Sequence, residues 1–210
     1  KRDFVSTVSH ELRTPLTSMR GAIGLILAGK AGEVPPKAKE LLQIGMTNTE
    51  RLIRLINDIL DVEKMDAGES PLRREPLRLR PIVEQTLGAL EAFAREHDVT
   101  LALTSGPVDA DLLGDPDRIT QVLTNLVSNA VKFSPAGAAV DVTLAPEAEG
   151  IALRIRDRGP GIPAEFAPRI FGRFQQAGGA DQRRSGGTGL CLNIARGIVE
   201  QHGGDRKSVV

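Results

Sequence analysis

The spacing of apolar residues in the first third of the chain is the feature that most constrains the fold. From about residue 3 to residue 65 they recur at steps of three and four, which places their side chains on one face of an α-helix. One such stripe contains Val5, Val8, Leu12, Leu16, Met19, Ile23 and Ile26. A second contains Leu41, Leu52, Ile56, Ile59 and Val62. The pattern predicts two long helices.

The segment between the two stripes, residues 29–36, contains two glycines and two prolines and predicts a turn. Two long helices joined by a short turn form an antiparallel hairpin. A lone hairpin with two apolar stripes usually buries them against a copy of itself. We therefore expect a homodimer built as a four-helix bundle.

Residues 66–71, Asp-Ala-Gly-Glu-Ser-Pro, predict the end of the second helix and a linker. Beyond them the pattern mixes strands and helices, which favours an α+β sandwich of helices on a sheet. We expect strands at 72–79, 99–104, 140–145 and 151–157, and helices at 81–97, 117–133 and 190–202. The predicted division is an all-α domain at 1–67, a linker at 68–75 and an α+β domain at 76–204.

Composition narrows the function classes. Lys plus Arg and Asp plus Glu both number 27, so the formal net charge is zero and no nucleic-acid partner is expected. The single cysteine allows no internal disulfide and fits a reducing compartment. No apolar run approaches the ~18 residues that span a bilayer. The sequence starts in mid-pattern, so we expect the cytoplasmic portion of a longer protein, anchored in the inner membrane only through segments outside this sequence.

His10 is the first candidate for chemistry. On a helical wheel the first apolar stripe centres about 160° away from it, so we expect its ring to face solvent. A neutral imidazole is a nucleophile at pH 7, and the adjacent Glu11 is placed to accept its proton. Thr14, four residues on, shares the face. By itself the pattern favours a surface histidine without a function.

Three further strings carry candidates for nucleotide binding. Asn125 and Asn129 are four residues apart, so they share a helix face with Lys132 nearby, which suits a magnesium–triphosphate complex as well as a solvated face. Asp157 is followed by glycines at 159 and 161, and its carboxylate is able to accept a hydrogen bond from an adenine amino group. The glycine-rich string at 186–192 opens a helix, as a phosphate cradle does.

The string Phe4-Val-Ser-Thr-Val-Ser-His-Glu-Leu-Arg-Thr-Pro-Leu-Thr17 resembles the phosphoacceptor box of bacterial sensor histidine kinases of two-component systems. The other strings follow in that family's order. The resemblance implies that His10 is phosphorylated, that Glu11 assists, and that Thr14 positions water during dephosphorylation of the partner. For the second domain it implies an ATPase fold of the gyrase, chaperone and histidine-kinase type. The roles implied there are Mg²⁺ ligation by Asn129, phosphate contacts by Asn125 and Lys132, adenine recognition by Asp157, Gly159 and Gly161, and a phosphate cradle of Gly187, Thr188, Gly189 and Leu190.

The implied activity is that of a protein-histidine kinase. ATP phosphorylates His10, and the phosphate then passes to an aspartate in the receiver domain of a response regulator. An impaired docking and phosphatase module, which no longer binds ATP productively, is the alternative. A mechanical ATPase ranks last, because those enzymes place a glutamate base where Asn125 stands and lack the histidine box.

Three further segments either extend the family pattern or depart from it. Residues 170–174 resemble the Phe-rich part of the kinase lid, and 175–185 are polar, as a mobile cover over ATP is. The family usually has glycine where this chain has Cys191, and we expect a helical conformation there that tolerates a small side chain. Residues 205–210 resemble a translated sequencing adapter, so we expect a non-native tail and a nucleotide domain that lacks its closing strands.

Overall fold

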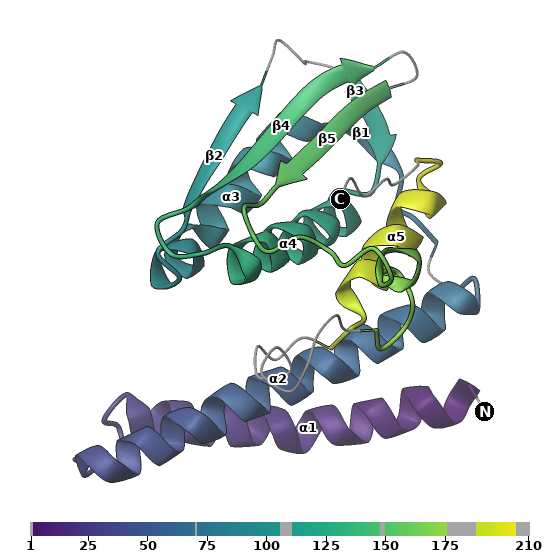
Figure 1. The fold of residues 1–210 in the computed structure, drawn as a ribbon. Helices are drawn as coiled ribbons and strands as arrows, with labels where there is room; N and C mark the ends of the chain where they lie inside the picture. The colour runs from purple at the N-terminus through teal and green to yellow at the C-terminus, as the bar shows by residue number, and fades with distance from the viewer. Residues whose placement is uncertain (1, 70, 106–110, 148–149, 176–187, 205–210) are drawn as a thin grey trace. The chain divides into compact units, whose positions relative to one another are not determined.

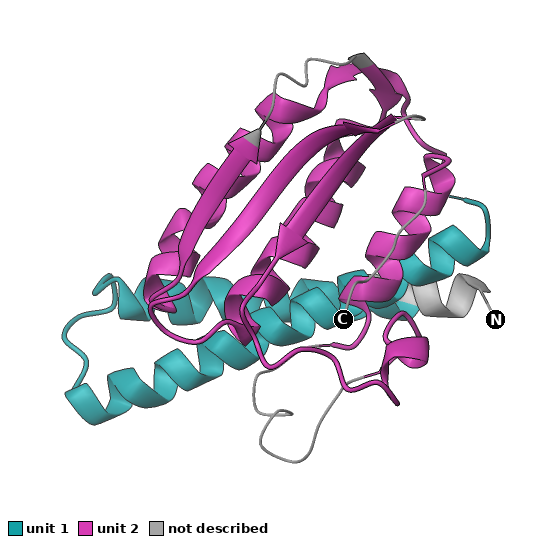
Figure 2. Cartoon of the chain, turned by 45° about the horizontal axis from the view of Figure 1, so that its top comes forward, with its two compact units in different colours: residues 1–70 teal, residues 71–210 magenta. Residues whose placement is uncertain are grey.

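The computed structural model describes residues 2–69, 71–105, 111–147, 150–175 and 188–204, without the side chains of residues 2–7, 10, 105 and 111. The chain divides into two compact units, Lys1–Ser70 and Pro71–Val210 (Figure 2). The first is helical and the second combines helices with a mixed sheet. The expected fold class is confirmed. No helix in the described ranges is long and apolar enough to cross a membrane.

The first unit is a hairpin of two long helices, α1 (Arg2–Leu27) and α2 (Pro36–Asp66), as Figure 1 shows. Helix α1 runs without interruption past Pro15. In the turn, Gly29 and Gly32 have φ angles of 74° and 97°, a region that glycine enters without a Cβ clash. The Arg13 guanidinium donates a hydrogen bond of 2.8 Å to the Asn57 side-chain oxygen and ties the two helices together.

The apolar stripes of the hairpin are only partly buried within a single chain. Four members are between 47% and 66% exposed: Leu12, Met19, Leu41 and Leu52. Leu25 and Ile44, outside the stripes, are both 59% exposed. The contact between α1 and α2 therefore covers only some of the residues that make up the two apolar stripes. The hairpin therefore exposes more apolar side chains than the scattered single ones that are usual on a protein surface.

The core of the second unit lies on one face of a three-stranded sheet (Figure 1). Its order is β2 (Thr100–Ser105), β4 (Ala139–Glu147) and β5 (Gly150–Arg156), with β2 parallel and β5 antiparallel to β4. Alternate residues of β4 are buried, as a strand with one covered face requires. Helices α3 (Leu79–Glu96) and α4 (Pro116–Phe133) supply the other half of this core.

A second, smaller sheet pairs β1 (Glu75–Arg78) with β3 (Asp111–Gly114) in antiparallel register. Strand β3 was not expected, because Asp-Leu-Leu-Gly is short and contains no β-branched or aromatic residue. The expected strand at 72–79 is shorter, since Leu79 already begins α3. A 3₁₀ turn, η1 (Ala167–Arg169), and helix α5 (Cys191–Gln201) complete the described elements.

The segment that leads into the second unit is bonded to it before β1 begins. The Arg73 backbone N–H donates to the Asp115 carboxylate at 3.0 Å, and the Arg74 guanidinium donates to the carbonyl of Gln201 at 2.9 Å. The second half of the expected linker is therefore fixed to the second unit. The tail at 205–210 lies outside the described residues.

Asp115 caps the start of α4. One carboxylate oxygen accepts from the backbone N–H groups of Asp117 and Arg118, both at 3.1 Å, and the other accepts from Arg73. Burial alone raises the pKa of this carboxyl. The three backbone donors and the nearby charge of Arg118 outweigh burial and hold the pKa below its ordinary value of 3.8.

Replacing Asp115 by alanine should lower the free energy of unfolding by about 1 kcal/mol at pH 7, because the cap is lost. A lowered native pKa means that the carboxylate stabilises the fold above its unfolded-state pKa and loses this contribution as pH falls through the native pKa. In urea unfolding of the whole chain, the difference between wild type and Asp115→Ala should therefore shrink as the pH is lowered from neutral to below the native pKa of Asp115. Asp117→Ala, which removes an exposed acid two residues away, is the control. If the difference in the free energy of unfolding between wild type and Asp115→Ala stayed the same at low pH, the lowered pKa of Asp115 would be contradicted as its cause.

Candidate phosphoacceptor and nucleotide sites

The expected phosphoacceptor residues lie on α1. His10 is within the helix, but its side chain lies outside the described side chains, so its orientation stays a prediction. Glu11 and Thr14 are both exposed. Arg13, three residues after His10, holds this stretch of α1 to Asn57 of α2. The helix near His10 is therefore tied to α2 by a side-chain hydrogen bond.

Helix α4 presents the expected phosphate and metal residues on the side away from the core. Its inward face carries Leu123, Val127 and Val131, each with no measurable exposure. At 100° per residue, the mean direction of Asn125, Asn129 and Lys132 lies about 170° from that face. All three are half-buried. Core packing therefore turns two amide groups and one cation outward together.

The start of α5 lies beside Asn125. The Asn125 side-chain N–H donates to the carbonyl of Cys191 at 3.4 Å. Just before the helix, the Thr188 hydroxyl accepts from the Leu190 backbone N–H at 3.2 Å. Cys191 is the first residue of α5 and is absent from the positive-φ residues. The expected helical conformation of Cys191 is confirmed.

Gly189 lies directly against the segment that resembles the lid. Its φ is 70°, and a Cβ there would come within 2.8 Å of the Phe174 backbone carbon and 2.9 Å of the Gln175 oxygen. The Asn193 side chain also donates to the carbonyl of Phe171 at 2.9 Å. Residues 170–175 are thus held against the start of α5, in turns and not in a regular helix. Gly187, and the rest of the expected cover, lie outside the described residues.

Asp157 follows β5 and is exposed. Its Oδ1 accepts from the Gly159 backbone N–H at 2.8 Å, which fixes the carboxylate in a tight turn and points to Oδ2 as the oxygen for a ligand. A Cβ at Gly159 would lie 2.6 Å from the carbonyl oxygen of Phe133, the last residue of α4. Gly161 has a φ of 76° and open space around it. The Arg158 guanidinium pairs with Asp141 at 2.9 Å and anchors this turn to β4.

These contacts bring the three strings together along α4. The start of α5 meets the helix at Asn125, and the turn of Asp157 and Gly159 meets it at Phe133. Those two points are eight residues, or about 12 Å, apart, with Asn129 between them. That span fits a nucleotide with phosphates at one end and its base at the other. Among the side chains described, no three of His, Cys, Asp or Glu gather as a metal site.

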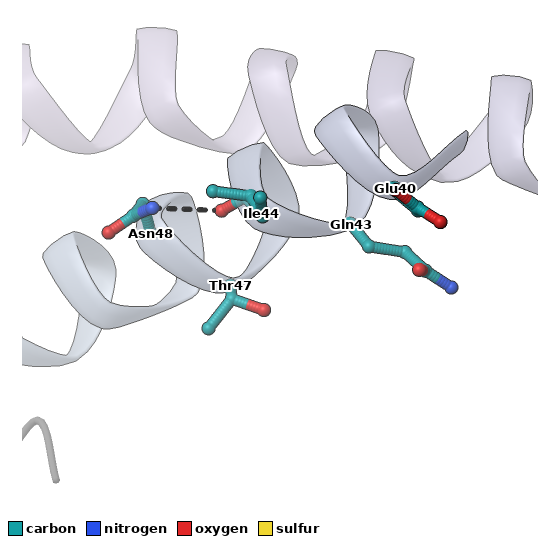
Figure 3. A pocket seen from close by; sticks show the side chains of 5 residues that line it. All are labelled: Glu40, Gln43, Ile44, Thr47 and Asn48. Atoms are coloured by element: carbon teal, nitrogen blue, oxygen red, sulfur yellow. Dashed lines mark hydrogen bonds between the residues drawn. The ribbon is translucent and has the colours of Figure 1, made fainter. Parts of the chain in front are cut away.

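Two surface hollows of the structure lie elsewhere, on the hairpin. One, of about 370 Å³, is an open face of α2 lined by Glu40, Gln43, Ile44, Thr47 and Asn48 (Figure 3). Within it the Asn48 side chain donates to the carbonyl of Ile44 at 2.9 Å and so belongs to the helix itself. The other lies at the hairpin turn. None of the expected nucleotide residues in the described part of the chain lines either hollow.

Two family models match the chain in the order of its two units. The His Kinase A (phospho-acceptor) domain matches residues 1–68. The histidine kinase-, DNA gyrase B- and HSP90-like ATPase family matches residues 114–208. The chain belongs to the histidine kinase family.

Curated relatives and solved structures agree with the family. The sensor histidine kinase WalK of Bacillus subtilis is 38% identical over 209 residues, 98% of this chain and 34% of WalK. The circadian histidine kinase CikA of Synechococcus elongatus is 37% identical over 97% of this chain and 27% of CikA. The chain thus spans about a third of these relatives or less.

Among solved structures, full-length ShkA with AMPPNP matches with a TM-score of 0.76 and 26% identity, over 96% of this chain and 41% of ShkA. The kinase ThkA, in complex with the response regulator TrrA, matches with a TM-score of 0.65 and 25% identity. That match covers 96% of this chain and 55% of ThkA. Both matches extend over the hairpin and the nucleotide unit.

Sequence reasoning missed two residues of the second unit, Asp115 and His202. The backbone N–H of Asp115 donates to Nε2 of His202 at 3.0 Å, which joins the start of α4 to the end of α5. The Asp115–Pro116 pair was a readable signal, because aspartate before proline is common where a helix begins. His202 gave no such signal, since its partner is a backbone group 87 residues away.

Gly159→Ala should weaken ATP binding by about tenfold or more, because the new methyl group meets the Phe133 carbonyl and displaces the turn that holds Asp157. Isothermal titration with ATP measures the change. Gly88→Ala is the control, because Gly88 is exposed on α3 and a Cβ there meets nothing within 4 Å. Unaltered affinity in Gly159→Ala would exclude this turn from the nucleotide site.

Proposed function

We propose that this chain is the catalytic portion of an ATP-dependent protein-histidine kinase that phosphorylates His10 and passes the phosphate to an aspartate of a response regulator. The observation that carries the proposal is the convergence of the three strings along α4. It is supported by a family match at each unit. The relatives WalK and CikA are named as histidine kinases.

In the proposed reaction, a ring nitrogen of His10 attacks the γ-phosphorus of ATP in line with the bridging oxygen. A P–N bond forms, the P–O bond to that oxygen breaks, and ADP leaves. The ring proton moves to Glu11. The transferring group carries little covalent chemistry with the protein, so positioning and charge neutralisation supply most of the rate. In the second transfer, a receiver aspartate takes the phosphoryl group and the P–N bond breaks.

Each nucleotide-site residue has a proposed role. Asn125 and Lys132 contact the phosphates, and Asp157 Oδ2 accepts from the adenine amino group. Gly159 and Gly161 allow the backbone to approach the base. Gly187, Thr188, Gly189 and Leu190 surround the phosphates at the start of α5, where backbone N–H groups favour negative charge. Asn129 is the residue that would hold Mg²⁺, which neutralises phosphate charge when bound. The outward, half-buried amide of Asn129 fits that ion.

The hairpin is proposed to act as a homodimer and as the docking site for the regulator. Apolar side chains left exposed on α1 and α2 supply a surface for a second copy. ThkA has been solved in complex with a response regulator, and its structure matches 96% of this chain. Thr14 is proposed to position water when the phosphorylated partner is dephosphorylated. Attachment of the parent protein to the inner membrane, with this portion cytoplasmic, stays a prediction.

The alternative, an impaired docking and phosphatase module, rests in part on Cys191. The helical conformation of Cys191 favours the active kinase, because no glycine-only backbone is needed there. Cys191→Gly should therefore leave ATP affinity within about threefold of wild type, since glycine in the first turn of a helix costs at most ~1 kcal/mol. Titration of both proteins with ATP checks this. A gain of tenfold or more in the glycine variant would favour the impaired reading.

The central proposal predicts that the chain incubated with γ-labelled ATP and Mg²⁺ acquires acid-labile, base-stable label. His10→Gln should reduce that label to background, because the accepting nitrogen is gone. The label is counted after acid and base treatment of the gel-separated protein. His97→Gln, which changes an exposed histidine at the end of α3, should keep the label. Label that persists in His10→Gln would contradict the proposal, and ATP hydrolysis without any label would favour a mechanical ATPase.

A further inference from the structure

The hydrogen bond between Asp115 and His202 fixes the protonation of the histidine ring. Nε2 lies 3.0 Å from the Asp115 backbone nitrogen, and Nδ1 lies 2.8 Å from the carbonyl oxygen of Ile198. A backbone N–H only donates and a carbonyl oxygen only accepts. The ring must therefore carry one proton, on Nδ1, and present a lone pair on Nε2. His202 thus acts as an acceptor from α4 and a donor within α5.

The surroundings of this bond are closely packed. A Cβ added at Gly114 would lie 3.1 Å from the His202 ring and 3.1 Å from the side chain of Ile119. Asp115 is 8% exposed. A buried backbone N–H that loses its acceptor carries the cost of its desolvation. The Asp115 N–H therefore depends on His202, and a side chain without an acceptor at that position leaves it unsatisfied.

Helices α4 and α5 are antiparallel and are joined at both ends. Asp115 meets His202 at one end, and Asn125 meets Cys191 at the other. The separations along the two helices match: ten residues, about 15 Å, on α4, and eleven residues, about 16 Å, on α5. The first bond, at 3.0 Å, is shorter than the second, at 3.4 Å. Of the two hydrogen bonds that join α4 and α5, the one to His202 has the better donor–acceptor distance.

We propose that His202 is a positioning residue for the nucleotide site: its bond to Asp115 sets the position of the start of α5 relative to Asn125 and Asn129. This inference rests on the proposed function, in which the phosphates bind between those residues and the start of α5. His202 touches neither the nucleotide nor the reacting atoms. It acts through α5, whose far end it holds against the cap of α4.

Two substitutions of His202 test the role. His202→Leu removes the acceptor and should raise the dissociation constant for ATP about fivefold. His202→Gln keeps an acceptor, because its side-chain carbonyl is able to take the Asp115 N–H, and should return the constant to within about twofold of wild type. A purely structural role predicts a lower melting temperature in both variants with unchanged ATP affinity.

His97 offers a matched control. It also caps the end of a helix, α3, and its Nδ1 lies 2.9 Å from the carbonyl of Phe93, four residues earlier, as in His202. No bond from its Nε2 is recorded among the described contacts. His97→Leu therefore removes the same intrahelical bond without a bond between helices. It should leave the ATP dissociation constant within about twofold of wild type.

The variants are compared by titration of the whole chain with ATP, after circular dichroism has established that each is folded. Equal affinity in His202→Leu and wild type, or no recovery in His202→Gln, would overturn the inference. Should the leucine variant not fold, ¹⁵N NMR of the wild-type ring supplies a second test. A proton on Nε2 would overturn the inference, and the Nδ1–H tautomer together with a functional glutamine variant would support it.

These outcomes are distinguishable from those of the labelling experiment. A chain that binds ATP, responds to His202→Leu as expected and acquires no label on His10 contradicts the proposed function alone. A chain that is labelled on His10 but binds ATP equally well as His202→Leu contradicts the positioning role alone. A wild-type chain that binds no ATP contradicts both.

Discussion

Burial of one face of α4 against the three-stranded sheet is the constraint on which the nucleotide unit depends. Leu123, Val127 and Val131 have no measurable exposure, and they pack with buried residues of β4 and α3 in a single core. Each such side chain contributes about 1.5–3 kcal/mol when fully buried. A rotation of α4 would lose that energy from several side chains together. The same packing therefore fixes which residues the helix turns outward.

With the rotation of α4 fixed, two glycines in the loops next to it allow the backbone to approach closely. At Gly159 the turn after β5 approaches the end of α4 so closely that a Cβ would overlap the Phe133 carbonyl. At Gly189 the chain packs against the backbone of Phe174 and Gln175 in a conformation that favours glycine. Both close approaches replace side-chain contacts with backbone ones.

The elements predicted most accurately are those in which the spacing of apolar residues matches the residues that pack against the core. Helix α4 begins one residue before the expected range, because its buried residues recur at helical spacing. Strand β5 spans all but one of its expected residues, because its apolar residues alternate and pack against the core. Strand β3 was missed because a four-residue edge segment has too little pattern to read. The hairpin was predicted, but the share of its stripes left exposed was not. The pattern shows which positions are apolar, but not which of them the neighbouring helix of the same chain buries.

The contacts that tie the nucleotide unit together were less predictable for a different reason. Asp115 bonds with His202 across 87 residues, and Arg74 with the carbonyl of Gln201 across 127. Each uses a backbone group, which every residue carries and which therefore leaves no mark in the sequence. Yet these bonds join three segments at one point: the entry to the unit, the cap of α4 and the end of α5. A displacement of the entry segment would strain the Asp115 carboxylate, and through it the two helices that carry the proposed phosphate contacts.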